Sequence, residues 1–383
     1  MKRSENRILT THVGSLIRPK ALLDTSKKAR DGSPADKQTY EALLSESVKE
    51  VVAMQADAGI DIVNDGEWGK SSWAAYVLER MTGFELRPDQ KRPVVWLGNE
   101  IERFHDHIAR EMPNALERPT EACIGPIAYQ DDGSLKRDAA NLRAALDGVN
   151  VEEAFITAVA PASTAYDGLD EYYKNEHDYI YAIADALRNE YRIIHEAGFL
   201  VQVDDAVLAN MYDHLVRQSP ERYKEWAGLR IEALNHALDG IPEDRVRYHV
   251  CFGSWHVPHT SDAPLEEIID FVLEVRAGAY SIESANVRHE HEWRIWENGR
   301  LPEGKILIPG VVTHHTITVE HPRLVADRIV RFAKLVGREN VIAGTDCGFA
   351  QVEGIQRVDP AIMWAKLESL SEGAKIASDE LWG

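Results

Sequence analysis

Side chains that can bind a metal ion stand at the ends of three predicted strands. His249 and Cys251 end one of them, and residues two apart on a strand point to the same face, so both can hold one ion. Glu283 and Cys347 end the two others. In a barrel, such strand ends face one mouth despite the long sequence gaps between them. Two thiolates, an imidazole and a carboxylate suit tetrahedral Zn²⁺.

Zinc with this ligand set would activate a thiol. A free alkyl thiol has a pKa of about 8.5, so little thiolate exists at neutral pH. Binding to the ion removes the proton, while the sulfur stays nucleophilic. Glu283 is a hard oxygen donor among softer ligands, which makes it the ligand that an incoming thiol displaces. An open position of this kind is typical of a catalytic zinc site rather than a structural one.

One order of elements recurs along the chain: an amphipathic helix, a glycine, a short β-branched strand and then polar residues. The first example spans 34–65, where Ser33 and Pro34 start the helix and Gly59 ends it. Parallel strands need crossover helices, so the alternation indicates a parallel sheet. The candidate strands are 8–13, 60–64, 124–128, 154–160, 199–203, 246–251, 279–282, 306–312 and 341–343.

A (β/α)₈ TIM barrel fits the length and the alternation best. The candidate strands exceed eight by one, so one of them is a hairpin piece or is wrongly assigned. Residues 85–120 are charged and contain proline, which suggests an excursion from the barrel rather than a second domain. We therefore expect a single catalytic domain over residues 1–383.

Composition excludes several classes of partner. The formal net charge of −20 argues against nucleic acid and against an anionic membrane surface. No apolar run reaches the roughly 18–20 residues that span a bilayer, and the N-terminus lacks the apolar stretch of a signal peptide. We expect a cytoplasmic protein, with a homo-oligomer as an open alternative. The cysteines Cys123, Cys251 and Cys347 are too few for a disulfide framework.

Several motifs carry a family resemblance over essentially the whole chain. They are Thr10-Thr11-His12-Val13-Gly14-Ser15, Asp65-Gly66-Glu67, Gln202-Val203-Asp204, His249-x-Cys251, Ile282-Glu283 and Asp346-Cys347-Gly348. With them the chain resembles the catalytic barrel of the cobalamin-independent methionine synthase family. It is most similar to the short members, which lack the N-terminal half of the full-length enzyme and include epoxyalkane–coenzyme M transferases.

The resemblance assigns roles to individual residues. It implies that zinc is held by His249, Cys251, Glu283 and Cys347. It also implies that the amino-acid portion of a homocysteine-like thiol is held by Ser15, Glu67 and Asp204, and that the catalytic histidine is His315.

Two departures from the family pattern concern the alkyl donor. Full-length members carry a tryptophan after the fourth strand that stacks on the folate pterin, whereas residues 155–161 contain none. Thr313 stands where the catalytic-histidine motif has an aspartate. The first departure, together with the missing N-terminal half, argues against polyglutamylated folate as the methyl donor, and the second leaves the proton-relay geometry open.

Three functions fit these residues. The first is methyl transfer to a homocysteine-like thiol, with a methylated corrinoid protein as one candidate donor. The second is ring-opening of an epoxide by a thiol such as coenzyme M, whose sulfonate would use Arg18 near Ser15. The third is a non-catalytic barrel with a structural zinc ion. In the first two, the partners are a small-molecule thiol and an alkyl donor.

Histidines and tryptophans are dense near the predicted strand ends. We interpret most of the histidines as structural hydrogen-bonding groups and leave His289 open; the others are His256, His259, His291, His314 and His321. The tryptophans either wall an apolar pocket or pack in the core, and they are Trp68, Trp73, Trp255 and Trp293.

Overall fold

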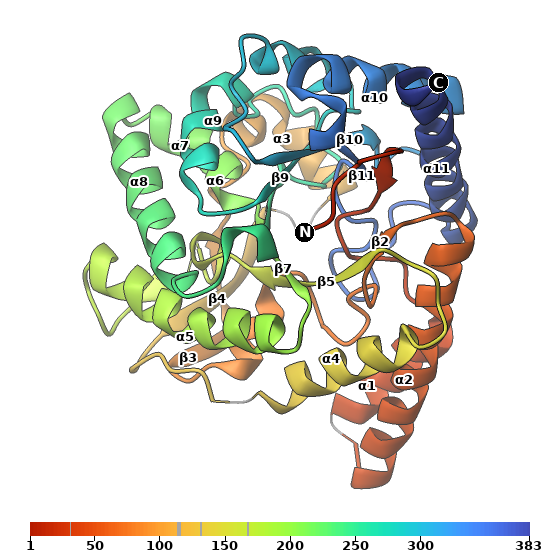
Figure 1. The fold of residues 1–383 in the computed structure, drawn as a ribbon. Helices are drawn as coiled ribbons and strands as arrows, with labels where there is room; N and C mark the ends of the chain where they lie inside the picture. The colour runs from red at the N-terminus through yellow and green to blue at the C-terminus, as the bar shows by residue number, and fades with distance from the viewer. Residues whose placement is uncertain (31, 113–115, 131, 167) are drawn as a thin grey trace.

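Eight parallel strands form a barrel at the centre of the molecule (Figure 1). The computed structural model describes residues 1–383 except 31, 113–115, 131 and 167. A parallel bridge between Thr11 and Ile62 joins the first strand of the sheet to the last. In spatial order the strands are β1 (Leu9–Thr10), β11 (Ile342–Thr345), β10 (Ile306–Val312), β9 (Ala279–Ile282), β8 (Val246–Val250), β7 (Leu200–Asp205), β5 (Glu153–Val159) and β2 (Ile62–Val63).

Helices surround these strands on the outside (Figure 1). They are α1 (Lys20–Arg30), α2 (Pro34–Asp57), α4 (Gly133–Ala145), α5 (Glu176–Glu196), α6 (Val207–Asn210), α7 (Tyr212–Val216), α8 (Pro220–Ala237), α9 (Leu265–Glu274), α10 (Pro322–Val336) and α11 (Pro360–Trp382). Their inner faces and the outer faces of the strands share one large buried apolar cluster. Among the described residues, no helix is both long and apolar enough to cross a bilayer.

Local sequence signals explain where these elements begin and end. Ser33 caps α2, its side chain accepts from the Asp36 amide, and Pro34 occupies the first helical turn. Gly59 ends the same unit at a φ of +81°. A side chain there would meet the Ser371 hydroxyl 2.1 Å away, so the position needs glycine for space as well as for conformation.

The structure confirms the barrel and eight of the nine candidate strands, and it corrects the ninth. Residues 124–128 are a loop, and the strand of this region is β4 (Glu117–Cys123), which ends before them. Ile124 is 47% exposed, and Pro126 has no amide proton to donate to a ladder. The apolar run was therefore a misleading signal, because it lies outside the barrel.

The predicted excursion over 85–120 is a small subdomain built beside the barrel. The strand β3 (Phe84–Pro93) pairs antiparallel with β4, and β4 pairs parallel with β6 (Leu169–Asp170). The helix α3 (Asn99–Glu111) belongs to it, whereas residues 113–115 lie outside the described residues. Apolar side chains on and beside α3 pack against Trp255 and Val257, which follow β8. The excursion thus borders the carboxyl ends of the strands.

The interior of the barrel changes from apolar to polar along the strands. Near the strand starts a separate apolar cluster contains Leu9, Ile62, Phe155, Leu200, Ala279, Ile306, Ile308 and Ile342. One level further, Gln202 of β7 is in register with Arg247 of β8. The Arg247 guanidinium donates to the Thr11 hydroxyl and the His12 carbonyl, both at 3.0 Å, and burial lowers its pKa to about 9. This polar layer forms the floor of the barrel mouth.

The close approach of β10 to β11 gives a first prediction. A methyl group on Gly310 would lie 2.1 Å from an Asp346 carboxylate oxygen and 2.7 Å from its Cα atom, so Gly310→Ala should destabilise the protein by about 1–3 kcal/mol. Urea unfolding would measure the change. Gly228 in α8 has no neighbour within 4 Å, so the control Gly228→Ala should stabilise by about 0.5–1 kcal/mol. Equal effects of the two changes would contradict this account.

Candidate metal centre and substrate cavity

Strand register brings the predicted site residues to one level of the barrel. Asp204 at the end of β7 is opposite His249 of β8, and His249 is opposite Ser281 of β9. Side chains two apart on a strand share a face, so Cys251 and Glu283 continue the same inward rows by one step. The next-but-one strand, β11, ends two residues before Cys347. Four strand ends therefore deliver these groups to a single mouth.

Three of the four predicted zinc ligands form a compact group. His249, Cys251 and Cys347 each place a ligand atom within 4.8 Å of the others. The two sulfur atoms are 3.4 Å apart, which is too far for a disulfide and suits two ligands of one ion. The Nδ1 atom of His249 is hydrogen-bonded to the Ser281 hydroxyl at 3.2 Å, whereas its buried Nε2 has no hydrogen-bond partner among the described residues. A nitrogen left free beside two thiols has the geometry of a metal ligand.

Without a cation, this group favours the protonated thiol of Cys251. The hydrogen bond with Cys347 and burial both raise the pKa of the Cys251 thiol well above its usual value. For His249, burial acts against protonation, but the neighbouring Cys251, Asp204 and Glu283 raise the pKa of the imidazole. The pKa of each group therefore responds to negative charge close by, and a bound cation would reverse that balance.

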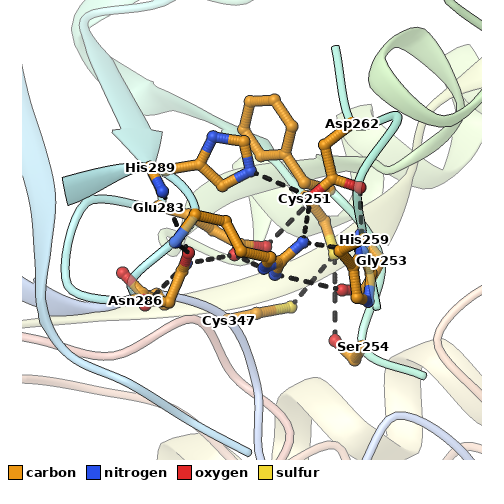
Figure 2. A network of polar contacts seen from close by, with 12 residues as sticks. Cys251, Gly253, Ser254, His259, Asp262, Glu283, Asn286, His289 and Cys347 are labelled. Carbon is orange, nitrogen blue, oxygen red and sulfur yellow. Dashed lines mark hydrogen bonds and ion pairs between the residues drawn. The ribbon is translucent and has the colours of Figure 1, made fainter. Parts of the chain in front are cut away.

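Glu283 lies beside the three ligands but is turned toward other partners. Its carboxylate accepts from the Phe252 amide at 3.0 Å, from the Asn286 side chain at 2.8 Å and from Arg288 at 3.1 Å. Figure 2 shows Glu283, Asn286 and Cys251 within one network of polar contacts. Burial, together with the charges of Cys251 and Asp346, raises the pKa of Glu283 to about 8 against the opposing effect of Arg288. Glu283 thus lies beside the metal group, by which we mean His249, Cys251 and Cys347, but hydrogen bonds hold its carboxylate away from the three candidate ligand atoms.

A second cluster of possible ligands is occupied by hydrogen bonds. Glu283, His314 and Asp346 place ligand atoms within 4.8 Å of one another. One Asp346 oxygen accepts from the amides of Ser284 and Ala285 at 2.7 and 2.8 Å, and the other accepts from Asn286 at 3.0 Å. Through these three hydrogen bonds the Asp346 carboxylate orders the loop after β9.

A cavity of about 240 Å³ opens beside the metal group and contains the three predicted substrate residues. Aromatic side chains form part of its wall. Its lining includes Ser15, Glu67, Asp204, His249, Cys251 and Cys347, together with Trp73, Trp96, Tyr166, Trp255 and Arg357. The cavity therefore joins a thiol-rich end to an acidic wall within reach of one small molecule.

Glu67 and Asp204 make that wall strongly acidic. Both are buried, and one Glu67 oxygen has no hydrogen-bond partner in the part of the chain that the structure describes. Glu67 has a φ of +59°, an unusual conformation that directs it to the mouth, and Gly14 leaves room for it, since a Cβ there would lie 2.7 Å from Glu67 Oε1. Burial raises the pKa of Asp204 to about 7, with Glu67 adding to the shift and His249 opposing it. Such a pair is suited to bind a cationic group.

Two residues with predicted roles lie outside this cavity. Arg18, considered for a sulfonate, donates instead to the backbone carbonyls of Ala350, Glu67 and Lys70 at 3.3, 2.7 and 2.9 Å. That expectation is wrong, because backbone structure already uses the guanidinium. His315 is absent from the described cavity lining, and its ring centroid lies 4.8 Å from that of His314. Burial, Arg288 and neighbouring histidines lower the pKa of His315 to about 3.

The tryptophans near the strand ends also differ in whether they line the cavity. Trp73 and Trp255 line the cavity, whereas Trp68 and Trp293 pack against the main apolar cluster. His321 caps α10, accepting from an amide of its first turn, as a structural histidine would.

Sequence reasoning missed several residues around the site. Trp96 of the excursion reaches the cavity and packs on Trp255 with ring centroids 4.1 Å apart. Nothing in its local sequence indicates that this segment returns to the mouth. Arg288 carried one signal, since it is a cation five positions after the acidic ligand candidate in a loop that follows a strand. Asp262, its partner, carried none.

Comparison with known proteins places this site in a family. Residues 158–365, more than half of the chain, match the family model described as the cobalamin-independent synthase catalytic domain. The chain belongs to that family. The matched segment holds Asp204, His249, Cys251, Glu283 and Cys347, so the candidate metal centre lies wholly within the family's catalytic domain.

Individual relatives of this synthase-family chain span nearly its whole length. A methionine synthase of Saccharolobus islandicus is 25% identical over 376 residues, covering 97% of this chain and 95% of the relative. A 2-hydroxypropyl-CoM lyase of Xanthobacter autotrophicus is 25% identical over 380 residues, covering 90% and 89%. The family is thus enzymatic and of the methionine synthase type.

Solved structures support the fold of this family member. A B12-independent methionine synthase from Shewanella sp. W3-18-1, in complex with selenomethionine, aligns with a TM-score of 0.75 at 19% identity. The alignment covers 98% of this chain and 99% of the chain in that structure. A putative vitamin-B12 independent methionine synthase from Listeria monocytogenes gives 0.67 at 19% identity, covering 99% and 100%.

The buried Asp204 gives a second prediction, for the metal-free protein. Its pKa is raised from 3.8 to about 7, so the folded state holds the proton more tightly than the unfolded state, and stability falls as pH rises through that window. Asp204→Asn removes the charge and should stabilise the metal-free protein more at pH 8 than at pH 5. Urea unfolding in a chelator would test this, with the exposed Asp327→Asn on α10 as control. A gain that is the same at both pH values would contradict the assigned cost of the charge.

Proposed function

We propose that this chain is a zinc-dependent S-alkyltransferase that transfers a methyl group to a homocysteine-like thiol, with residues 1–383 as a single catalytic barrel. One observation carries the proposal: the group of His249, Cys251 and Cys347 opens onto the cavity whose other wall bears Glu67 and Asp204. A thiol that also carries an ammonium group would match both ends. The family membership supports the same class of reaction.

The donor set fits zinc. Two thiols and an imidazole with a free buried nitrogen lie within ligand distance of one another, and this S₂N set suits Zn²⁺ better than the harder cations that prefer oxygen. Glu283 is the fourth ligand that we propose. When bound, the zinc ion supplies the positive charge that allows a substrate thiol to ionise at neutral pH.

The residues of this chain orient the substrate. Glu67 and the ionised Asp204 bind the ammonium group, and the amide of Ser15 binds the carboxylate beside it. The Gly14 amide does not take part, because it donates to His12 Nδ1 at 3.1 Å. These contacts turn the thiol toward Cys251 and Cys347. If zinc were bound, Glu283 would be the ligand that a substrate sulfur could replace, and its carboxylate would still have the donors Phe252, Asn286 and Arg288. The aromatic side chains of the cavity wall exclude water from the reacting atoms.

His315 remains the catalytic histidine in this proposal. Its neighbour His314 interacts through Nε2 with the Ser254 hydroxyl at 2.8 Å, and Ser254 lines the cavity. The ring contact between His314 and His315 links the histidine to that wall. The donor of the methyl group is either a small molecule or a methylated corrinoid protein, two sources that an assay with each would separate.

A second candidate is ring-opening of an epoxide by a sulfonate-bearing thiol. The observation that favours it is Arg357, which lines the cavity and donates its Nε to Gln351 at 3.0 Å. No carboxylate of the described residues pairs with Arg357 within 4.0 Å, so its guanidinium is available to an anion. The similarity to a 2-hydroxypropyl-CoM lyase is consistent with this alternative.

The third prediction concerns metal content. The purified protein should hold about one zinc ion per chain, and Cys251→Ser or Cys347→Ser should lose it, because each removes a thiolate from a site that has two. Cys123 lies on β4 outside the group, so Cys123→Ser is the matched control and should keep the ion. Glu283→Gln should weaken zinc binding less than either cysteine change. Mass spectrometry decides the matter, and full zinc in both serine variants would reject the site.

The fourth prediction separates the two candidate thiols. L-homocysteine should raise the sulfur count at zinc from about two to about three in X-ray absorption, whereas coenzyme M should leave it unchanged. Asp204→Asn should weaken homocysteine binding about ten-fold or more, because it removes a charge-assisted hydrogen bond. Binding to the wild-type protein should strengthen as pH rises through about 7, where Asp204 ionises. A response to coenzyme M alone, lost in Arg357→Met, would favour the epoxide reaction.

A further inference from the structure

The carboxylate of Glu283 is already bound to a cation of the protein. Arg288 donates to Glu283 Oε2 at 3.1 Å, and the same oxygen accepts from Asn286. It is the one ion pair with a described residue that Glu283 makes. Glu283 is fully buried, so the donors Arg288 and Asn286 take the place of the water that would otherwise solvate an ionised carboxylate.

Arg288 is itself fixed by a second set of contacts on its far side. It forms a short ion pair with Asp262 and lies 2.8 Å from His259 Nδ1. Asp262 in turn contacts His259 at 2.8 Å and His289 at 3.2 Å. Figure 2 shows Asp262, His259 and His289 in the network that also contains Glu283 and Cys251. The guanidinium is therefore held in place whether or not Glu283 is bound to it.

We propose that Arg288 is a positioning residue that competes with the metal ion for Glu283, and so sets how readily a substrate thiol replaces that ligand. The inference rests on the proposed function, since it assumes that Glu283 is the exchangeable ligand. The carboxylate has two alternative partners, the ion and the Asp262-anchored guanidinium. Arg288 lowers the cost of releasing a buried charge from the ion, because the released carboxylate meets a cation instead of an apolar wall.

Competition for Glu283 and a purely structural role of Arg288 predict opposite changes in zinc affinity when Arg288 is removed. If Arg288 only held the loop after β9 in shape, its removal would loosen that loop and weaken zinc binding. If Arg288 competes for Glu283, its removal leaves the ion as the one cation for the carboxylate. Zinc would then bind more tightly, and a thiol would displace Glu283 less easily.

The test measures zinc affinity by chelator competition and L-homocysteine affinity by calorimetry on the same full-length variants. Arg288→Met should tighten zinc about ten-fold and weaken homocysteine by a similar factor, the scale of one hydrogen bond to a charged group. Arg288→Lys keeps the cation and should lie between Met and wild type. The control Arg300→Met removes a surface ion pair with Asp270 and should change neither affinity.

A double variant shows whether the effect passes through the carboxylate. In Glu283→Gln the amide no longer binds a cation strongly, so adding Arg288→Met should produce no further tightening of zinc. Weaker or unchanged zinc binding in both Arg288 variants would overturn the proposal, as would tightening that persists in the double variant. Failure of the proposed function looks different, because the wild-type protein would then bind zinc but not homocysteine.

Discussion

Negative charge buried at the barrel mouth is the constraint on which the rest of the site depends. Glu67, Asp204, Glu283 and Asp346 are all buried at the carboxyl ends of the strands. Among the described residues, the ion pair of Glu283 with Arg288 is the one that any of the four makes. Burial of ionised carboxylates without compensation is costly, and two thiols stand beside them. The mouth is therefore suited to cations, which is why we propose a metal ion and a substrate ammonium group there.

The barrel fold meets the geometric half of this requirement. Parallel strands in lateral register place Asp204, His249 and Ser281 at one level, although they are far apart in the sequence. Backbone hydrogen bonds fix the register, so the distance between His249 and Cys251 does not depend on a flexible loop. Below that level, the buried guanidinium of Arg247 ties β8 to the N-terminal segment through Thr11 and His12. The metal group thus stands on a rigid floor.

Sequence periodicity was sufficient to predict the barrel and the convergence of His249, Cys251 and Cys347 at its mouth, because both follow from short-range rules. The other site residues were assigned from the family resemblance. A helix, a glycine and a strand repeat visibly, and ligands two apart on a strand need no tertiary information. One cause explains both the misassigned run 124–128 and the unforeseen Trp96. The region outside the barrel lacks the repeated order of helix, glycine and strand on which the prediction relied. Arg18 failed for another reason, because its backbone carbonyl partners cannot be recognised from residue types. The predicted roles of all the site residues, those of Glu283 and His315 included, stay predictions.

The division between strand ends and loops also bears on how one family contains different reactions. In the proposed function, thiol binding relies on strand-end residues, whose positions the barrel fixes. Another part of the cavity wall comes from loops and from the excursion, through Trp96, Trp255 and Arg357, and we propose that it faces the alkyl donor. Loops accept substitution and insertion at lower cost than strands do. A methionine synthase and a 2-hydroxypropyl-CoM lyase are each 25% identical to this chain, and a fold that fixes strand-end residues while its loops vary can accommodate such different reactions in one family.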